Sequence, residues 1–93
     1  MKIYKFCADL CSGCRQMSGI LDKVLVDFPE VELIEKKIFT LGKGEDQAIL
    51  DEAEEKKVEA LPTLIFEKDG KEVDRVSGVI QKQALIDKIK ELM

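Results

Sequence analysis

Apolar residues recur along the chain with two different periods, and the alternation between these periods predicts an α/β fold. Residues 2–7 form a run rich in Ile, Tyr and Phe, which predicts a buried strand. A short loop at 8–12 follows. From Cys14 to Phe28 the apolar residues lie three or four positions apart, as on one face of a helix. We expect Pro29 to end that helix.

The remaining segments continue the alternation of strands and helices. The same patterns predict a strand at 31–39, a glycine-containing loop at 40–45, a charged surface helix at 46–57, a strand at 64–66, an Asp-Gly hairpin turn at 67–71, a returning strand at 72–76 and a last amphipathic helix after Gly78. The order β-α-β-α-β-β-α opens with a βαβ unit, which requires a parallel strand pair and a right-handed crossover. We therefore expect one domain over residues 1–93, with a four-stranded mixed sheet flanked by three helices.

Composition and charge exclude several classes of partner. The chain has 93 residues, of which 45% are hydrophobic and 37% charged, as in a folded domain. Its net charge is -4 and it has no dense basic run, which argues against nucleic acid or an anionic membrane as a partner. The N-terminus runs directly into a strand, and the apolar stretch at 60–66 is too short to span a bilayer. We expect a cytoplasmic monomer.

The three cysteines point to a reactive site. They all fall between Cys7 and Cys14, whereas a disulfide framework would spread its cysteines to join distant segments. Cys11 and Cys14 are separated by two residues at the start of the first helix, so both sulfurs can meet across one helical turn. Free N–H groups at a helix N-terminus stabilise a thiolate. Cys11, beside the loop and expected to be exposed, is the predicted attacking thiol; Cys14, on the apolar helix face, is the predicted resolving thiol.

These residues carry a resemblance to the thioredoxin-like family that extends over essentially the whole chain. A C-x-x-C motif beside a βαβ unit is one mark of that family. Three segments resemble it in the correct order: Phe6 to Arg15 around the cysteines, Ala60 to Phe66 with the following Asp-Gly hairpin, and Val76-Ser77-Gly78 before the last helix. The first strand and helix of full-length thioredoxins are missing.

The resemblance implies a thiol–disulfide oxidoreductase that reduces protein disulfides and needs no bound cofactor or metal. Cys11 would be the nucleophile and Cys14 the resolving cysteine. Pro62 would be a cis-proline facing the disulfide, although a trans proline opening an edge strand is an alternative. The backbone of Leu61 would pair with an extended substrate segment, and Gly78 would leave room for the partner's backbone. A reductase or another thiol donor would have to restore the dithiol.

The chain departs from the family pattern at several positions. Ser12-Gly13 replaces the common Gly-Pro pair, a place where redox potential is altered, and Leu10 replaces a tryptophan. Lys5 stands where thioredoxins usually carry a buried acid. A lone buried lysine is costly, so we expect either a charge-swapped pair with Glu35 that tunes the cysteines or a route for Lys5 to solvent.

Cys7 leaves two interpretations open: a small buried apolar residue at a strand end, or a third redox thiol. The spacing of Cys7, Cys11 and Cys14 also matches that of radical-SAM iron–sulfur ligands, but that chemistry needs a much larger barrel. A zinc site with three cysteines would lack a nearby fourth ligand, unless Asp9 or water supplied it. The remaining alternative is a non-catalytic interaction or redox-sensing module of the same fold.

Overall fold

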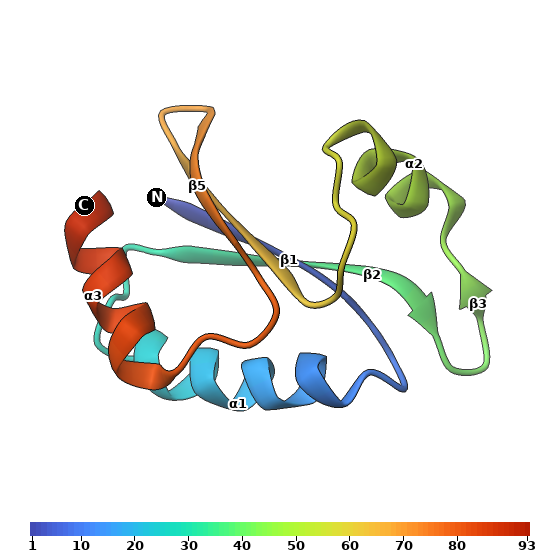
Figure 1. Ribbon diagram of the computed structural model, residues 1–93, viewed down its shortest axis with the longest axis horizontal. Helices are drawn as coiled ribbons and strands as arrows, with labels where there is room; N and C mark the ends of the chain where they lie inside the picture. The colour runs from blue at the N-terminus through green and yellow to red at the C-terminus, as the bar shows by residue number, and fades with distance from the viewer.

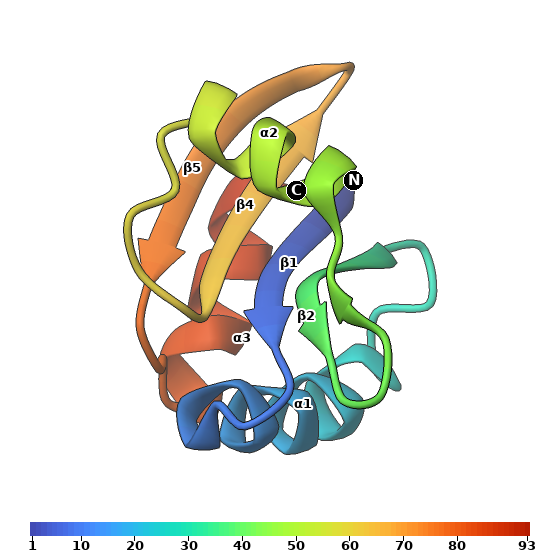
Figure 2. The same cartoon turned by 90° about the vertical axis from the view of Figure 1, so that its right-hand side faces the viewer.

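The computed structural model describes all 93 residues and shows a twisted mixed sheet with helices on both faces (Figures 1 and 2). In chain order the elements are β1 (Lys2–Ala8), α1 (Ser12–Leu25), β2 (Glu32–Thr40), β3 (Gly44–Glu45), α2 (Gln47–Glu55), β4 (Thr63–Lys68), β5 (Lys71–Ser77) and α3 (Lys82–Leu92). The strands are ordered β3-β2-β1-β4-β5 across the sheet. The predicted α/β class is therefore confirmed.

The central strand β1 has a different kind of neighbour on each side. It pairs in parallel with β2, and this register sets Lys5 opposite Glu35. On its other side β1 is antiparallel to β4, which forms a hairpin with β5. The crossover from β1 to β2 passes through α1, so the start of α1 follows directly from the C-terminal end of the central strand (Figure 2).

Alternate side chains of β1 face two separate apolar layers. Ile3 joins the larger cluster beneath α1 and α3, with Met17, Leu21 and Leu85 among its fully buried members. Phe6 belongs to a smaller cluster beneath α2. Lys5 and Cys7 share the α1 side with Ile3, because strand residues two apart point to the same face. None of the three helices has the length and apolar content needed to cross a membrane.

The sheet has five strands, and the predicted number of four was wrong. Gly44–Glu45, within the segment predicted as a loop, pairs antiparallel with Phe39 and Thr40 at the end of β2. Two residues are too few to establish a period of two, so this strand has no recognisable pattern in the sequence. It extends only one end of the β2 edge.

The first helix ends at Leu25, earlier than predicted. The Asp27 and Phe28 amides donate to carbonyls three residues before them, at 3.1 Å each, so the chain tightens into a turn after Leu25. Pro29 ends the helix four residues before itself, because its ring would clash with the carbonyl of Leu25 in a continued helix and because it disfavours helical geometry at Phe28.

Arg75 of β5 fastens the end of α2 to the sheet. Its guanidinium donates to the Lys56 carbonyl at 3.0 Å and to the Lys57 carbonyl at 3.4 Å, immediately after the helix. The same group binds both carboxylate oxygens of Glu72, at 2.6 and 2.7 Å. The carbonyls of the two residues that follow the helix thus receive a charged donor from a strand residue 18 or 19 positions away in the sequence.

Candidate active site

Cys11 is the N-cap residue of α1. Its backbone is extended, with φ -105° and ψ 109°, and its Sγ accepts a hydrogen bond from the Cys14 amide at 3.2 Å. An N–H donor and the positive end of the helix dipole are therefore both directed at this sulfur, which stabilises a negative charge on it. Cys11 is half-buried rather than exposed as predicted, but it is the more accessible of the two thiols.

Cys14 lies one helical turn further along and is 3% exposed. Burial, followed by the hydrogen bond and the charge of Cys11, raises the pKa of its thiol to about 11, although a hydrogen bond with the Ala8 backbone opposes this rise. Both cysteines are free thiols in this structure. At neutral pH Cys14 is thus protonated, and Cys11 is the sulfur that receives the N–H donor at the helix N-terminus.

Pro62 packs against the dipeptide between the two cysteines. A Cβ atom added to Gly13 would lie 3.2 Å from Cδ of Pro62 and 3.4 Å from Cγ2 of Val79, so this position is nearly closed to a side chain. The Leu61–Pro62 peptide bond is cis. Ser12, the other residue between the cysteines, is exposed at the first position of α1.

The segment beside Pro62 offers unpaired backbone groups. The carbonyl of Pro62 accepts from the Gly78 amide at 2.7 Å, but neither the amide nor the carbonyl of Leu61 forms a hydrogen bond within the chain. Gly78 has φ +87°, which explains why this position favours glycine, and nothing lies within 4 Å of where its Cβ would be. The backbone beside the cysteines is therefore open to an extended partner.

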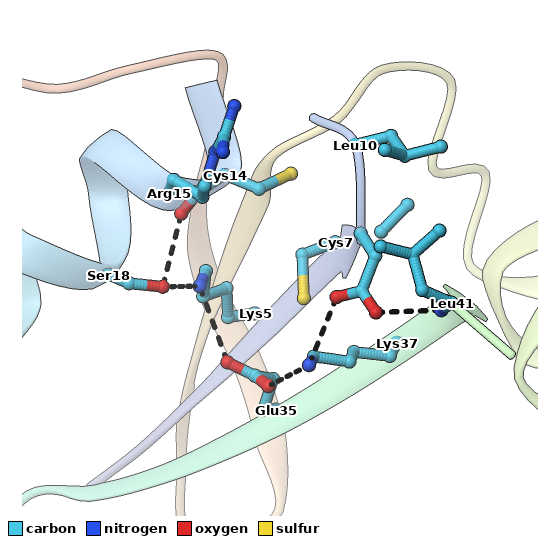
Figure 3. Close-up of a pocket in the computed structure, with 11 residues that line it drawn as sticks. Lys5, Cys7, Leu10, Cys14, Arg15, Ser18, Glu35, Lys37 and Leu41 are labelled. Carbon is cyan, nitrogen blue, oxygen red and sulfur yellow. Dashed lines mark hydrogen bonds and ion pairs between the residues drawn. The ribbon is translucent and has the colours of Figure 1, made fainter. Parts of the chain in front are cut away.

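A pocket of about 340 Å³ lies beneath the start of α1, and the Lys5 and Glu35 side chains are among those that line it (Figure 3). Nζ of Lys5 lies 3.4 Å from Oε2 of Glu35 and also donates to Oγ of Ser18. The hydroxyl of Ser18 donates in turn to the Cys14 carbonyl at 3.1 Å. Lys5 is 2% exposed, whereas the side chain of Glu35 is 42% exposed, so Lys5 does not reach solvent and Glu35 does.

A second ion pair continues this chain of charges along the pocket wall. Lys37 lies 3.7 Å from Oε1 of Glu35 and 3.2 Å from Oδ1 of Asp9 (Figure 3). The other oxygen of Asp9 accepts from the Leu41 amide at 2.8 Å, and this bond, followed by Lys37, holds the pKa of Asp9 below its usual value. Asp9 thereby joins the loop before Cys11 to the loop after β2.

Cys7 lines the same pocket from β1 and is 2% exposed. Burial, followed by the charge of Glu35, raises the pKa of its thiol to about 11, and the charges of Lys5 and Lys37 only partly offset this. A buried thiol that remains protonated is a weak nucleophile. This position suits a small apolar residue better than a third redox thiol.

Two polar members of the pocket were not predicted. Ser18 lies four residues after Cys14 on the same helix face, and Lys37 lies two residues after Glu35 on the same strand face. These spacings could have identified both residues once the Lys5–Glu35 pair was considered. The chain contains no cluster of three or more Cys, Asp or Glu residues arranged to hold a metal ion.

Comparison with known proteins agrees with this geometry. The sequence model of the thioredoxin family matches residues 1–91. The chain belongs to the thioredoxin family. Thioredoxin of Chlamydia pneumoniae is 36% identical over 84 residues, covering 90% of this chain and 74% of that protein. Thioredoxin H-type of Picea mariana is 41% identical over 73 residues, covering 78% of this chain and 52% of that protein.

Solved thioredoxin structures share the fold. The crystal structure of thioredoxin from Aeropyrum pernix superimposes with a TM-score of 0.80 at 25% identity, covering 99% of this chain and 74% of that one. Fasciola hepatica thioredoxin gives a TM-score of 0.77 at 30% identity, covering 97% of this chain and 78% of that one. This thioredoxin-family chain is accordingly a thiol–disulfide oxidoreductase.

Proposed function

We propose that the chain reduces disulfide bonds of protein substrates by dithiol exchange, with Cys11 as nucleophile and Cys14 as resolving thiol. The observation that carries this proposal is the unequal setting of the two sulfurs. Cys11 receives the Cys14 amide at the helix N-terminus, and Cys14 is buried with its pKa raised to about 11. Only Cys11 is suited to begin the reaction at neutral pH.

The same setting gives the two attacks an order. The Cys11 thiolate attacks one sulfur of the substrate disulfide, the substrate S–S bond breaks, and the released substrate thiolate takes a proton from solvent. In the mixed disulfide Cys11 carries no charge, so one cause of the raised Cys14 pKa is removed. Cys14 then loses its proton and attacks the Cys11 sulfur, which releases the second substrate thiolate and leaves a Cys11–Cys14 disulfide.

The free backbone groups of Leu61 support a docking role for the segment before Pro62. An extended substrate can add to unpaired N–H and C=O groups as a further strand, and its cysteine would then lie beside the helix start. Gly78, whose amide donates to the Pro62 carbonyl, has open space where a side chain would lie. We assign Leu61, Pro62 and Gly78 to substrate binding on this basis.

Lys5 and Glu35 are proposed to set the electrostatic potential beneath the cysteines, together with the Ser12-Gly13 dipeptide above them. The ammonium of Lys5 reaches the first turns of α1 through Ser18. A cation here favours the thiolate form of nearby sulfurs, whereas Glu35 and Asp9 oppose it. The redox potential of the pair therefore depends on the whole ion chain.

The partners of this reaction are protein disulfides on one side and a reductase or thiol donor on the other. Each turnover leaves the pair oxidised, so two electrons must be supplied before the next. We propose that the chain works as a monomer in the cytoplasm, where the thiol pool is reducing. The competing hypothesis is an interaction or redox-sensing module that does not turn over.

The test is dithiothreitol-driven reduction of a protein disulfide by wild type, Cys11→Ser, Cys14→Ser and Cys7→Ser. We expect the first two variants to lose catalysis and the third to keep it. Cys14→Ser should also accumulate a mixed disulfide between Cys11 and the substrate, detectable by mass spectrometry. Folded wild-type protein without activity would support the non-catalytic module, and loss of activity in Cys7→Ser would give Cys7 a role in turnover.

A further inference from the structure

A second pocket, of about 550 Å³, lies on the α2 side of the sheet and is separate from the pocket that contains Lys5. We call it the α2 groove; its walls come from the end of β2, from α2 and from the loop before Pro62, and comprise Ile38, Gln47, Leu50, Ala53, Glu54, Val58, Glu59, Ala60 and Leu61. Six of these nine residues are hydrophobic. An open apolar groove on a chain this small is the type of surface that receives a partner's side chain.

The α2 groove is continuous with the backbone that we assign to substrate docking. Leu61 lines the groove with its side chain, while its amide and carbonyl have no partner within the chain. Its side chain packs against the cluster of Phe6, Ala53 and Ile65, so it lies on the α2 face of the sheet. In an added strand, the residue directly opposite Leu61 projects to the same face.

The rim of the groove is acidic. Glu54 and Glu59 are exposed, neither forms an ion pair, and no Lys or Arg lines the groove. A partner with carboxylates near this point would therefore be repelled, whereas a lysine or arginine would find two unpaired carboxylates. The apolar floor suits an apolar side chain of a ligand, and the acidic rim suits a basic side chain of the same ligand.

We propose that the α2 groove is a specificity site for disulfide substrates that place an apolar side chain opposite Leu61 and a lysine or arginine beside it. This rests on the proposed reductase function and adds a substrate class to it. Leu61 is adjacent to Pro62, and Pro62 packs on Gly13 between the two cysteines. Because an extended strand rises by about 3.3 Å per residue, the substrate residues that the groove selects lie within about three positions of the substrate cysteine that Cys11 attacks.

The experiment uses short peptides whose single cysteine is capped with thionitrobenzoate, so that attack by Cys11 releases a coloured thiolate. At each position within three residues of the cysteine, one set of peptides compares Leu with Asp and a second set compares Arg with Glu. Rate constants are measured for wild type, for the double variant Glu54→Gln and Glu59→Gln, and for the matched control Glu30→Gln and Glu91→Gln. The control removes two exposed carboxylates that lie outside the groove.

We expect wild type to prefer Arg over Glu peptides by about threefold to tenfold at low salt, as two exposed charge pairs would give. Leu should be preferred over Asp by about tenfold at the position opposite Leu61. The charge preference should shrink below about twofold in the groove variant and at high salt, and persist in the control. An equal preference in groove and control variants would overturn the proposal. Loss of thiolate release from every peptide, with wild type no faster than Cys11→Ser, would instead refute the reductase function.

Discussion

The unequal burial of Lys5 and Glu35 predicts that removing one partner destabilises the chain far more than removing the other. Glu35→Gln leaves an ammonium that is 2% exposed with only Ser18 and a neutral amide around it. Lys5→Met leaves a carboxylate that is 42% exposed and hydrated, and it fills the same space with an apolar side chain. We expect the hydrogen bond from Ser18 to the Cys14 carbonyl to persist in both variants, because neither substitution changes its donor or its acceptor.

The separation of the two groups fixes the size of the effect. At 3.4 Å two unit charges attract by about 5 kcal/mol with an effective dielectric constant of 20, and by about 1 kcal/mol in bulk water. Because Glu35 is partly hydrated and a glutamine oxygen still accepts from Lys5, we expect Glu35→Gln to cost about 2 kcal/mol. Lys5→Met should stay within about 1 kcal/mol of wild type, since replacing a buried charge by an apolar group removes its desolvation cost.

The assay is urea unfolding of the reduced proteins at neutral pH, followed by far-ultraviolet circular dichroism because the chain has no tryptophan. For a domain of this size, 2 kcal/mol corresponds to roughly 10 °C in Tm. The control pair is Lys88 and Asp74, 2.6 Å apart and 26% and 33% exposed, where Lys88→Met and Asp74→Asn should have small and similar effects. If Lys5→Met lowers the free energy of unfolding as much as Glu35→Gln does, then the unequal burial of the two groups does not determine what each contributes to stability.

Three other features give predictions. The pKa values of Cys7 and Cys14 are raised to about 11 in the folded chain, chiefly by burial, so the unfolded chain loses these two protons at a lower pH than the folded chain does. The stability of the reduced protein should therefore fall as the pH rises from about 9 to 11. Urea titrations should show that Cys7→Ala lessens this fall by up to about 1.4 kcal/mol per pH unit, and an unchanged slope would contradict the assignment. Arg75→Met should lower the free energy of unfolding by about 1–2 kcal/mol and accelerate hydrogen exchange at the end of α2, and Arg75→Lys should have an intermediate effect. Unchanged exchange at the end of α2 would show that the hydrogen bonds from Arg75 do not stabilise the helix there. Asp46→Ala removes the N-cap bond to the Ile49 amide at 3.2 Å and should cost about 1 kcal/mol, whereas Asp46→Ser should cost little by thermal unfolding.

Much of the fold followed from periodicity, because the long elements bury one face each. The helix beginning near Cys14 and the alternating strand at 31–39 were predictable for this reason, whereas β3 is too short to carry a period. The early end of α1 depended on a proline four residues beyond it, an effect that acts through a clash and leaves no apolar pattern.

The candidate site divides in the same way. Cys11 and Cys14 are neighbours in sequence, so their spacing alone predicted that they would meet. Lys5 and Glu35 could be paired because parallel strands β1 and β2 keep them in register. The cap from Arg75 to the end of α2 and the acidic groove join segments that have no common motif. Their contacts depend on how α2 lies over the sheet, which a local pattern does not specify.

The Lys5–Glu35 pair also restricts how these two positions can diverge among related sequences. Lys5→Asp alone, a step toward the acid that thioredoxins usually carry there, would place two carboxylates against each other beneath α1. Glu35→Lys alone would place two ammonium groups in the same pocket. Each single exchange is expected to be worse than both together, because contacting charges couple and their effects do not add. A reversal of charge at one position should therefore be accompanied by a reversal at the other, and a sequence that reverses the charge at only one of them should be rare.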